Sequence, residues 1–136
     1  MIVADTSGLL ALYNEREPAH GRVAEIVRAQ REPLVVSPYV VAEVDYLIAT
    51  RLGVEAELAV LRELAGGAYD LPAVDAALLA AITQVIERYR DHSIDVADAS
   101  IVVLADRSRT RDVLTLDRRH FGVLRPMTGG RFRLLP

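Results

Sequence analysis

Four carboxylates stand where this sequence could do chemistry. Asp5 and Asp117 each directly follow a short apolar run that is typical of a buried strand, and Glu43 and Asp98 lie near the starts of two expected helices. Ligands of parallel α/β sheets bind outside the carboxyl ends of the strands. We therefore expect all four acids to map to one rim of one sheet.

Each acid alone also has a simpler explanation. Aspartate is a common turn residue and helix N-cap, which could account for Asp5 and Asp117. Asp95 and Asp98 have the spacing of an N-cap and a first-turn acid, a pairing that the helix dipole favours. Glu43 borders the apolar stripe of its helix and could reach out to solvent. The functional interpretation rests on the four acids together.

Gathered carboxylates need compensation. Two such charges about 6 Å apart, at an effective dielectric constant of about 20, repel by roughly 3 kcal/mol. The cluster is tolerable with raised pKa values or a bound cation, and oxygen-only ligands suit Mg²⁺ or Mn²⁺. The three histidines lack the spacing of zinc ligands and are expected to be structural or solvated. They are His20, His92 and His120.

The elements that position these acids alternate along the chain. Strands are expected at residues 2–4, 33–37, 68–71, 113–116 and 131–135. Helices are expected at 8–13, from Pro18, from Ser37-Pro38 to Gly53, from there to Gly66-Gly67, from Asp75 to Tyr89 and from Asp95 to Ala105. This order predicts one α/β domain over residues 1–136 with a mainly parallel sheet.

Composition excludes several kinds of enzyme. The 136 residues contain no cysteine, so disulfides, thiolate metal sites and cysteine nucleophiles are ruled out. All sixteen basic residues are arginine. Without lysine, the chain cannot form a Schiff base or a P-loop of the usual kind. No apolar run is long enough to span a membrane and the first residues do not resemble a signal peptide, so we expect a cytoplasmic protein.

Charge is divided unevenly along the chain. Residues 1–106 carry eight arginines and seventeen acids, a net charge of −9, and residues 107–136 carry eight arginines and two acids, a net charge of +6. Planar guanidinium groups suit phosphate oxygens, although a solvated arginine-rich surface explains the same numbers. The arginines nearest in sequence to the predicted acidic site are Arg107, Arg109, Arg111, Arg118 and Arg119.

Four motifs occur in a characteristic order. They are Ile-Val-Ala-Asp5-Thr6-Ser7, Ser-Pro-Tyr-Val-Val-Ala-Glu43-Val, Asp95-Val-Ala-Asp98-Ala-Ser100 and Leu-Thr115-Leu-Asp117-Arg-Arg-His120-Phe121. At these residues the chain resembles the PIN-domain ribonucleases, and most closely the VapC toxins of bacterial type II toxin–antitoxin modules. No single motif is specific, but the ordered set spans nearly the whole chain.

The resemblance implies a three-layer α/β/α fold. It also implies an Mg²⁺-dependent endoribonuclease that hydrolyses phosphodiester bonds of tRNA or rRNA by metal-activated water, with Mn²⁺ as a plausible substitute. Asp5 and Asp98 match the main metal ligands of the family, and Glu43 and Asp117 match acids that bind the metal directly or through water. The polar positions beside them, expected to orient ligands or the attacking water, are Thr6, Ser7 and Thr115, with Asp95 as an often acidic further position.

The resemblance also implies partners. These are an RNA substrate, a second copy of the chain and a cognate antitoxin, in a heterotetramer or a larger assembly. An antitoxin segment would pack in a groove made by the early helices. The apolar candidates for that groove, most of which could equally be internal core, are Val40, Val41, Val44, Leu47, Leu58 and Leu61.

Two other functions fit parts of the pattern. A phosphoryl-transfer domain of the receiver or haloacid-dehalogenase kind also places aspartates at strand ends with Mg²⁺. Both of these depend on a lysine, which this chain lacks, and the second kind needs an Asp-x-Asp start, whereas Thr6-Ser7 follows Asp5. A PIN-like binding or scaffold module without catalysis is the other alternative, and the complete acidic quartet argues against it.

Overall fold

The computed structural model describes all residues, 1–136, and its centre is a parallel sheet. The five strands lie in the order β3-β2-β1-β4-β5, and every neighbouring pair is parallel. They are β1 Ile2–Ala4, β2 Leu34–Val36, β3 Tyr69–Asp70, β4 Asp112–Leu114 and β5 Arg133–Leu135. The helices are α1 Thr6–Tyr13, α2 His20–Ala29, α3 Pro38–Leu52, α4 Val54–Ala65, α5 Ala76–Arg88, α6 Val96–Arg107 and α7 Arg118–Val123.

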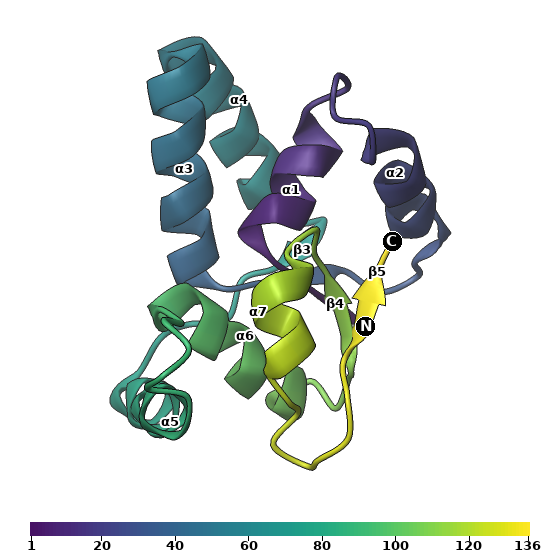
Figure 1. Cartoon of the computed structure of the whole chain (residues 1–136). Helices are drawn as coiled ribbons and strands as arrows, with labels where there is room; N and C mark the ends of the chain where they lie inside the picture. Colours follow the sequence, from purple (N-terminus) through teal and green to yellow (C-terminus); the bar gives the residue numbers. More distant parts are fainter.

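The helices cover both faces of the sheet. Figure 1 shows α1 to α4 in the upper half of the molecule and α5 to α7 in the lower half, with the strands between them. Buried side chains of α6 pack against β1 and β4 on one side and against α5 on the other. The expected α/β fold with three layers is therefore confirmed.

The strand order creates one point where the chain changes direction. From β1 the chain runs outward to β2 and β3, and it then returns to β4, on the other side of β1, before reaching β5. Loops that leave β1 and β4 therefore diverge at the carboxyl edge of these two strands. A crevice at such a point is the usual ligand site of open α/β sheets.

The core is formed by the central strands and by α6. All three residues of β1 and of β2 are buried, as the continuous apolar runs predict for strands covered on both faces. In α6 the buried stretch is nearly continuous, from Ala97 through Ala105 with Asp98 as the one partly open position. No helix combines the length and the apolar character needed to cross a bilayer.

Several helix ends agree with the predictions. The side chain of Ser37 caps α3, with Pro38 as the first helical residue, and Gly53 ends this helix with a φ of 87°. Asp75 caps α5 by accepting the Leu78 N–H at 2.7 Å. These ends follow from local chemistry, because short polar side chains satisfy free N–H groups and glycine tolerates positive φ.

Other boundaries differ from the predictions. Helix α1 begins at Thr6 rather than Gly8, because the Asp5 side chain caps it, and α2 begins at His20, since the residues after Pro18 form a turn. Helix α7 was not expected. Asp117 caps it by accepting the N–H groups of Arg119 and His120, both at 3.0 Å. The strand expected at residues 113–116 ends at Leu114.

Candidate functional site

Asp5 directly follows β1, at the point where the chain changes direction across the sheet, and its side chain is nearly closed to water. The residue is 6% exposed. Its Oδ2 accepts hydrogen bonds from Ser7 Oγ at 2.6 Å and from Thr115 Oγ1 at 2.7 Å. Ser7 belongs to the first turn of α1 and Thr115 follows β4, so one carboxylate oxygen joins three segments. The structure thus brings together three of the residues that the sequence singled out.

Glu43 lies in the second turn of α3 and contacts α1. Its Oε2 accepts a hydrogen bond from Thr6 Oγ1 at 2.6 Å. Burial raises the pKa of Glu43 above its ordinary value; the bond from Thr6 opposes this, and the charges of Asp95 and Asp5 add to the increase. Glu43 is therefore within electrostatic reach of acids from β1 and from the start of α6.

Asp98 lies in the first turn of α6. It forms the capping box with Asp95, in which each side chain accepts the other residue's N–H, at 3.0 and 3.4 Å. Burial, and then the charge of Asp95, raise the pKa of Asp98 to about 6, and Asp5 acts in the same direction. The buried Ser100 Oγ donates to Ser37 Oγ at 2.6 Å, which holds the start of α6 against the start of α3.

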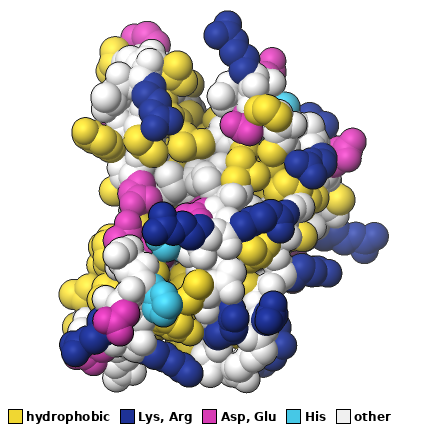
Figure 2. Space-filling model, in the orientation of Figure 1, with side chains coloured by type: hydrophobic (Ala, Val, Ile, Leu, Met, Phe, Trp, Pro, Cys, Tyr) yellow, Lys and Arg dark blue, Asp and Glu magenta, His cyan; other side chains and the backbone are white.

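Three of the four predicted acids therefore converge. Asp5 directly follows β1, Glu43 lies in α3 and Asp98 in α6, and the charge of Asp5 contributes to the raised pKa values of the other two. Figure 2 shows acidic side chains gathered where the first turns of α3 and α6 approach each other, with histidine and arginine beside them. No three acidic or histidine side chains are arranged to hold a metal ion as they stand. Instead, each carboxylate is held by hydroxyl or N–H donors of the chain itself.

Asp117 has different surroundings from the other three acids. Its Oδ1 accepts the two N–H groups that open α7, and its Oδ2 lies 2.7 Å from His120 Nδ1. Burial alone would raise the pKa of Asp117, but the hydrogen bonds and charge of His120 hold it below its ordinary value. The same bond raises the pKa of His120. His120 was expected to be merely structural or solvated, and only its spacing of three residues from Asp117 hinted at this pair.

The donor set fits a hard divalent cation by its chemistry. All candidate ligands are carboxylate oxygens, and the chain has no thiolate. The raised pKa values of Glu43 and Asp98 have burial and neighbouring negative charge as their causes. A cation would offset both, because it favours the ionised form of each acid.

The five candidate arginines are divided between the two edges of the sheet. Arg118 and Arg119 begin α7 beside Asp117, at the edge of the acids. Arg107 ends α6, and Arg109 and Arg111 lie in the connection that leads to the start of β4. The 12 residues of α6 separate its two ends by about 16 Å. The structure therefore leaves Arg107, Arg109 and Arg111 at the opposite edge from the acids.

We expect the stability of the metal-free protein to depend on the ionisation of Asp98. Its pKa is about 6 in the folded chain and 3.8 ordinarily, so the folded state binds the extra proton between these values. The contribution of Asp98 to the free energy of unfolding is therefore lost as pH rises from about 4 to 6. Since water partly screens this side chain, the loss is about 1 kcal/mol.

The measurement is urea unfolding of wild type and Asp98→Asn in EDTA at pH 4.5 and 7.5. The variant cannot ionise, so its stability relative to wild type is expected to be higher at the upper pH. The same stability difference between variant and wild type at pH 4.5 and at pH 7.5 would contradict the raised pKa of Asp98.

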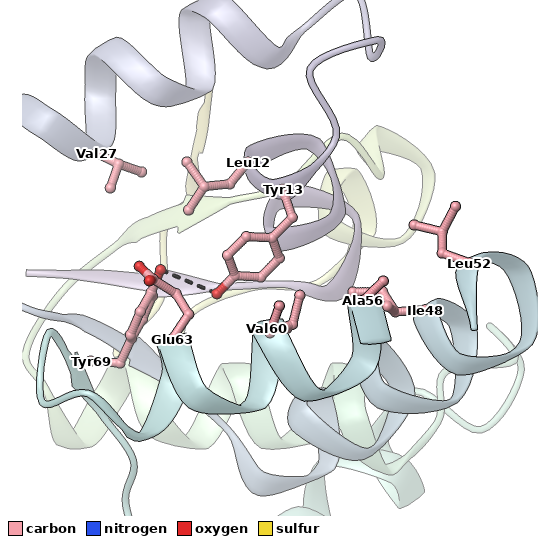
Figure 3. Close-up of a pocket in the computed structure, with 10 residues that line it drawn as sticks. Leu12, Tyr13, Val27, Ile48, Leu52, Ala56, Val60, Glu63 and Tyr69 are labelled. Atoms are coloured by element: carbon pink, nitrogen blue, oxygen red, sulfur yellow. Dashed lines mark hydrogen bonds between the residues drawn. The ribbon is translucent and has the colours of Figure 1, made fainter. Parts of the chain in front are cut away.

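A second candidate site is an apolar groove between α1, α2 and the α3–α4 hairpin (Figure 3). Its volume is about 530 Å³, and Ile48, Leu52, Ala56 and Val60 form the hairpin side. At one end Tyr13 Oη donates to Tyr69 Oη at 3.1 Å, with Glu63 beside them. Burial, and then this bond, raise the pKa of Tyr13.

The groove differs from the one expected from the sequence. Val40 and Val44 are core residues with 0% exposure. None of the six expected side chains lines the groove of Figure 3, and Leu47 lines a separate hollow beside Ser7 and Leu10. Ile48 continues the buried stripe of Val40 and Val44 by one turn, to the point where that stripe reaches the groove. In α4 the lining comes from Ala56 and Val60, which lie on a different face of the helix from Leu58 and Leu61.

Comparison with known proteins identifies the family. The PIN domain model matches residues 2–124. The chain belongs to the PIN-domain family. This PIN domain is 56% identical, over 135 residues, to Ribonuclease VapC26 of Mycobacterium tuberculosis, covering 99% of this chain and 100% of that protein. The resemblance to VapC proteins stated above is thereby confirmed.

Solved structures share the fold of this PIN domain. The VapC20 crystal structure from Mycobacterium tuberculosis, described as a Sarcin-Ricin loop cleaving toxin, matches with a TM-score of 0.78 at 20% identity, over 86% of this chain and 90% of that one. FitAcB from Neisseria gonorrhoeae matches with a TM-score of 0.63 at 22% identity, over 90% and 91%. At these identities the likeness concerns the fold.

Proposed function

We propose that this PIN domain is a metal-dependent endoribonuclease and the toxin of a toxin–antitoxin module. The observation that carries the proposal is the convergence of Asp5, Glu43 and Asp98, from three segments, at the carboxyl edge of the sheet. The similarity to a protein named as a ribonuclease supports it. The four acids Asp5, Glu43, Asp98 and Asp117 also stand in the sequence motifs by which the chain resembles the PIN-domain ribonucleases.

The chain's own residues have distinct parts in this proposal. Asp5 and Asp98 would be the main ligands of Mg²⁺, with Glu43 and Asp117 binding directly or through water. Ser7 and Thr115 hold Asp5 in one orientation, and Thr6 does the same for Glu43. A bound ion would activate the water that attacks phosphorus. The same ion would offset the charge that develops on the phosphate.

We expect the substrate to be a structured RNA such as tRNA or rRNA. The resemblance to the VapC ribonucleases, which implies tRNA or rRNA, supports this class. Hydrolysis by water does not use the 2′-hydroxyl as nucleophile, so a preference for RNA must come from shape and from contacts to the strand.

The expected antitoxin would bind the groove of Figure 3. The groove is open, nearly all of its lining is apolar, and Leu52 on its rim is 69% exposed. An amphipathic segment that places apolar side chains along α3 and α4 would cover it. The antitoxin would join two copies of this chain in a heterotetramer or a larger assembly.

The decisive experiment is RNA cleavage by the purified chain, free of antitoxin, with Mg²⁺, Mn²⁺ or EDTA. Cleavage is expected with either ion and none with EDTA, with 5′-phosphate ends that can be mapped across total RNA. Absence of cleavage with every divalent ion, on total RNA, would contradict the nuclease proposal.

One observation favours the alternative of a binding module without catalysis. No three carboxylates form a ready metal site in this structure. Calorimetric titration with Mn²⁺ separates the two functions, because a binding module would take up no ion at the acids. Loss of the Mn²⁺ signal in Asp98→Asn would place the ion at the acids.

Arg119 is expected to contribute a phosphate contact. It is exposed and lies in the first turn of α7, beside Asp117. Each phosphate that a protein neutralises adds about 0.7–0.9 to the slope of log affinity against log salt. Arg119→Ala should therefore lower that slope by about one unit for RNA bound in EDTA, whereas Arg109→Ala, at the opposite edge, should leave it unchanged. Equal slopes for wild type and Arg119→Ala would contradict the contact.

A further inference from the structure

A small pocket lies between the loop that joins α5 to α6 and helix α7. Its volume is about 160 Å³. Residues 91–94 of the loop form one side, and Arg119, His120 and Val123 of α7 form the other. The acids and hydroxyls of the predicted catalytic site do not line it.

The pocket adjoins the acidic site through His120. The Nδ1 atom of this ring is held by Asp117 Oδ2 at 2.7 Å, which leaves Nε2 for another partner. His120 therefore lines the pocket with one part of its ring and bonds one of the four proposed acids with another. A strand of RNA with its scissile phosphate at the acids would have its next nucleotide within reach of the pocket.

The loop side of the pocket has a defined shape. The His92 N–H donates to the Tyr89 carbonyl at 2.9 Å, and the two rings meet edge to face with centroids 6.1 Å apart. Tyr89 Oη accepts the backbone N–H of Arg125, which lies two residues beyond α7, at 3.2 Å. Ser93 has a φ of 52°, a conformation that non-glycine residues adopt only where their surroundings impose it. The pocket is therefore preformed.

Its lining suits a neutral, planar and polar group. Asp91 would repel a phosphate and Arg119 would repel a cation. Asp91 and the Nε2 atom of His120 can bond the edge of a nucleobase, which carries donors and acceptors, while Arg119 stays available for the adjacent phosphate. Ile94 and Val123 supply apolar surface for the faces of a ring. The volume is below the roughly 300 Å³ at which pockets for whole small ligands begin, so a single ring system fits better than a nucleotide.

We propose that this pocket binds one unpaired nucleobase of the RNA, next to the scissile phosphate, and so selects where the strand is cut. The inference rests on the nuclease function proposed above. It adds a specificity site that lies outside the acidic quartet.

The test uses an RNA that contains the cut site mapped with wild type, and a series of the same RNA with one abasic nucleotide at each flanking position. Wild type should lose about tenfold in kcat/KM at one position, the factor expected when one bound base is lost. Val123→Met should lose a similar factor in kcat/KM on intact RNA. The abasic nucleotide at that position should cause no further loss in this variant. Methionine fills the pocket without adding a charge or an aromatic surface.

Two further variants sharpen the test. Asp91→Asn should change the preferred base at the same position, because an amide offers a donor where the carboxylate offers only acceptors. Asp70→Asn, an exposed acid at the end of β3, serves as the matched control and should behave as wild type. Val123 is 38% exposed, so its variant is expected to fold, as thermal unfolding would verify.

The possible failures can be told apart. Wild type that cuts the RNA but tolerates an abasic nucleotide at every position overturns the pocket and leaves the nuclease intact. The same holds if the dependence on the base persists in Val123→Met. Wild type that cuts no RNA with any divalent ion overturns the nuclease proposal and, with it, this inference.

Discussion

Asp5→Asn is expected to lower kcat/KM for RNA cleavage by about 1000-fold, since loss of a metal ion's contribution of several kcal/mol has that effect. Asparagine has the same size and still offers one oxygen to the hydroxyls of Ser7 and Thr115. It also remains a good N-cap for α1. The substitution therefore removes the negative charge and little else.

Stability should be nearly unchanged in this variant. Asp5 is 6% exposed and lies near two other acids, so loss of its charge removes repulsion while its hydrogen bonds persist. The matched control is Asp75→Asn, the same change at the exposed N-cap of α5. The measurements are cleavage of one RNA at saturating Mg²⁺ and thermal unfolding. Cleavage within tenfold of wild type would remove Asp5 from the catalytic group.

Gly8→Ala is expected to destabilise the protein by about 3 kcal/mol, the upper part of the usual range for overpacking. Gly8 lies in α1, where the helix crosses β4. A Cβ atom there would be 2.3 Å from the Leu114 carbonyl oxygen and 2.9 Å from Leu114 Cγ. The oxygen belongs to the backbone of a central strand, so α1 itself would have to move away from the sheet.

The matched control for this prediction is Gly21→Ala in α2. No atom lies within 4 Å of a Cβ built there, and alanine is a better helix former by about 1 kcal/mol. The two variants should therefore shift the urea midpoint in opposite directions. Because α1 also carries Thr6 and Ser7, RNA cleavage should fall in Gly8→Ala at temperatures where the variant is still folded. Equal stability of both variants would contradict the close contact between α1 and β4.

Sequence patterns predicted the larger elements well because their signals are local. Apolar runs indicated β1 and β2, and Ser37-Pro38 indicated the start of α3. Helix α7 was not predicted, because its six residues are too few to show a 3.6-residue period. Its capping residue, Asp117, was predicted as one of the four site acids, with an N-cap or turn residue as the simpler alternative, and no helix was expected after it.

The candidate site was predicted in part for the same reason. Acids that directly follow strands, or lie near the start of a helix that runs antiparallel to the strands, are placed at the carboxyl edge of a parallel sheet. The convergence of Asp5, Glu43 and Asp98 could therefore be predicted without distances. The positions of the arginines could not. Arg107 is nine residues from Asp98 in sequence, yet α6 carries it to the other edge of the sheet.

The sequence by itself determined the fold class, the rim at which the acids gather and the donor chemistry available there. Those properties depend on residue types and on spacing within single elements. The tertiary structure decided which groups touch across elements: Thr115 on Asp5, Thr6 on Glu43, and the α5–α6 loop against α7. Such contacts depend on how helices pack on the sheet to within about an ångström, because hydrogen bonds and close packing tolerate little more.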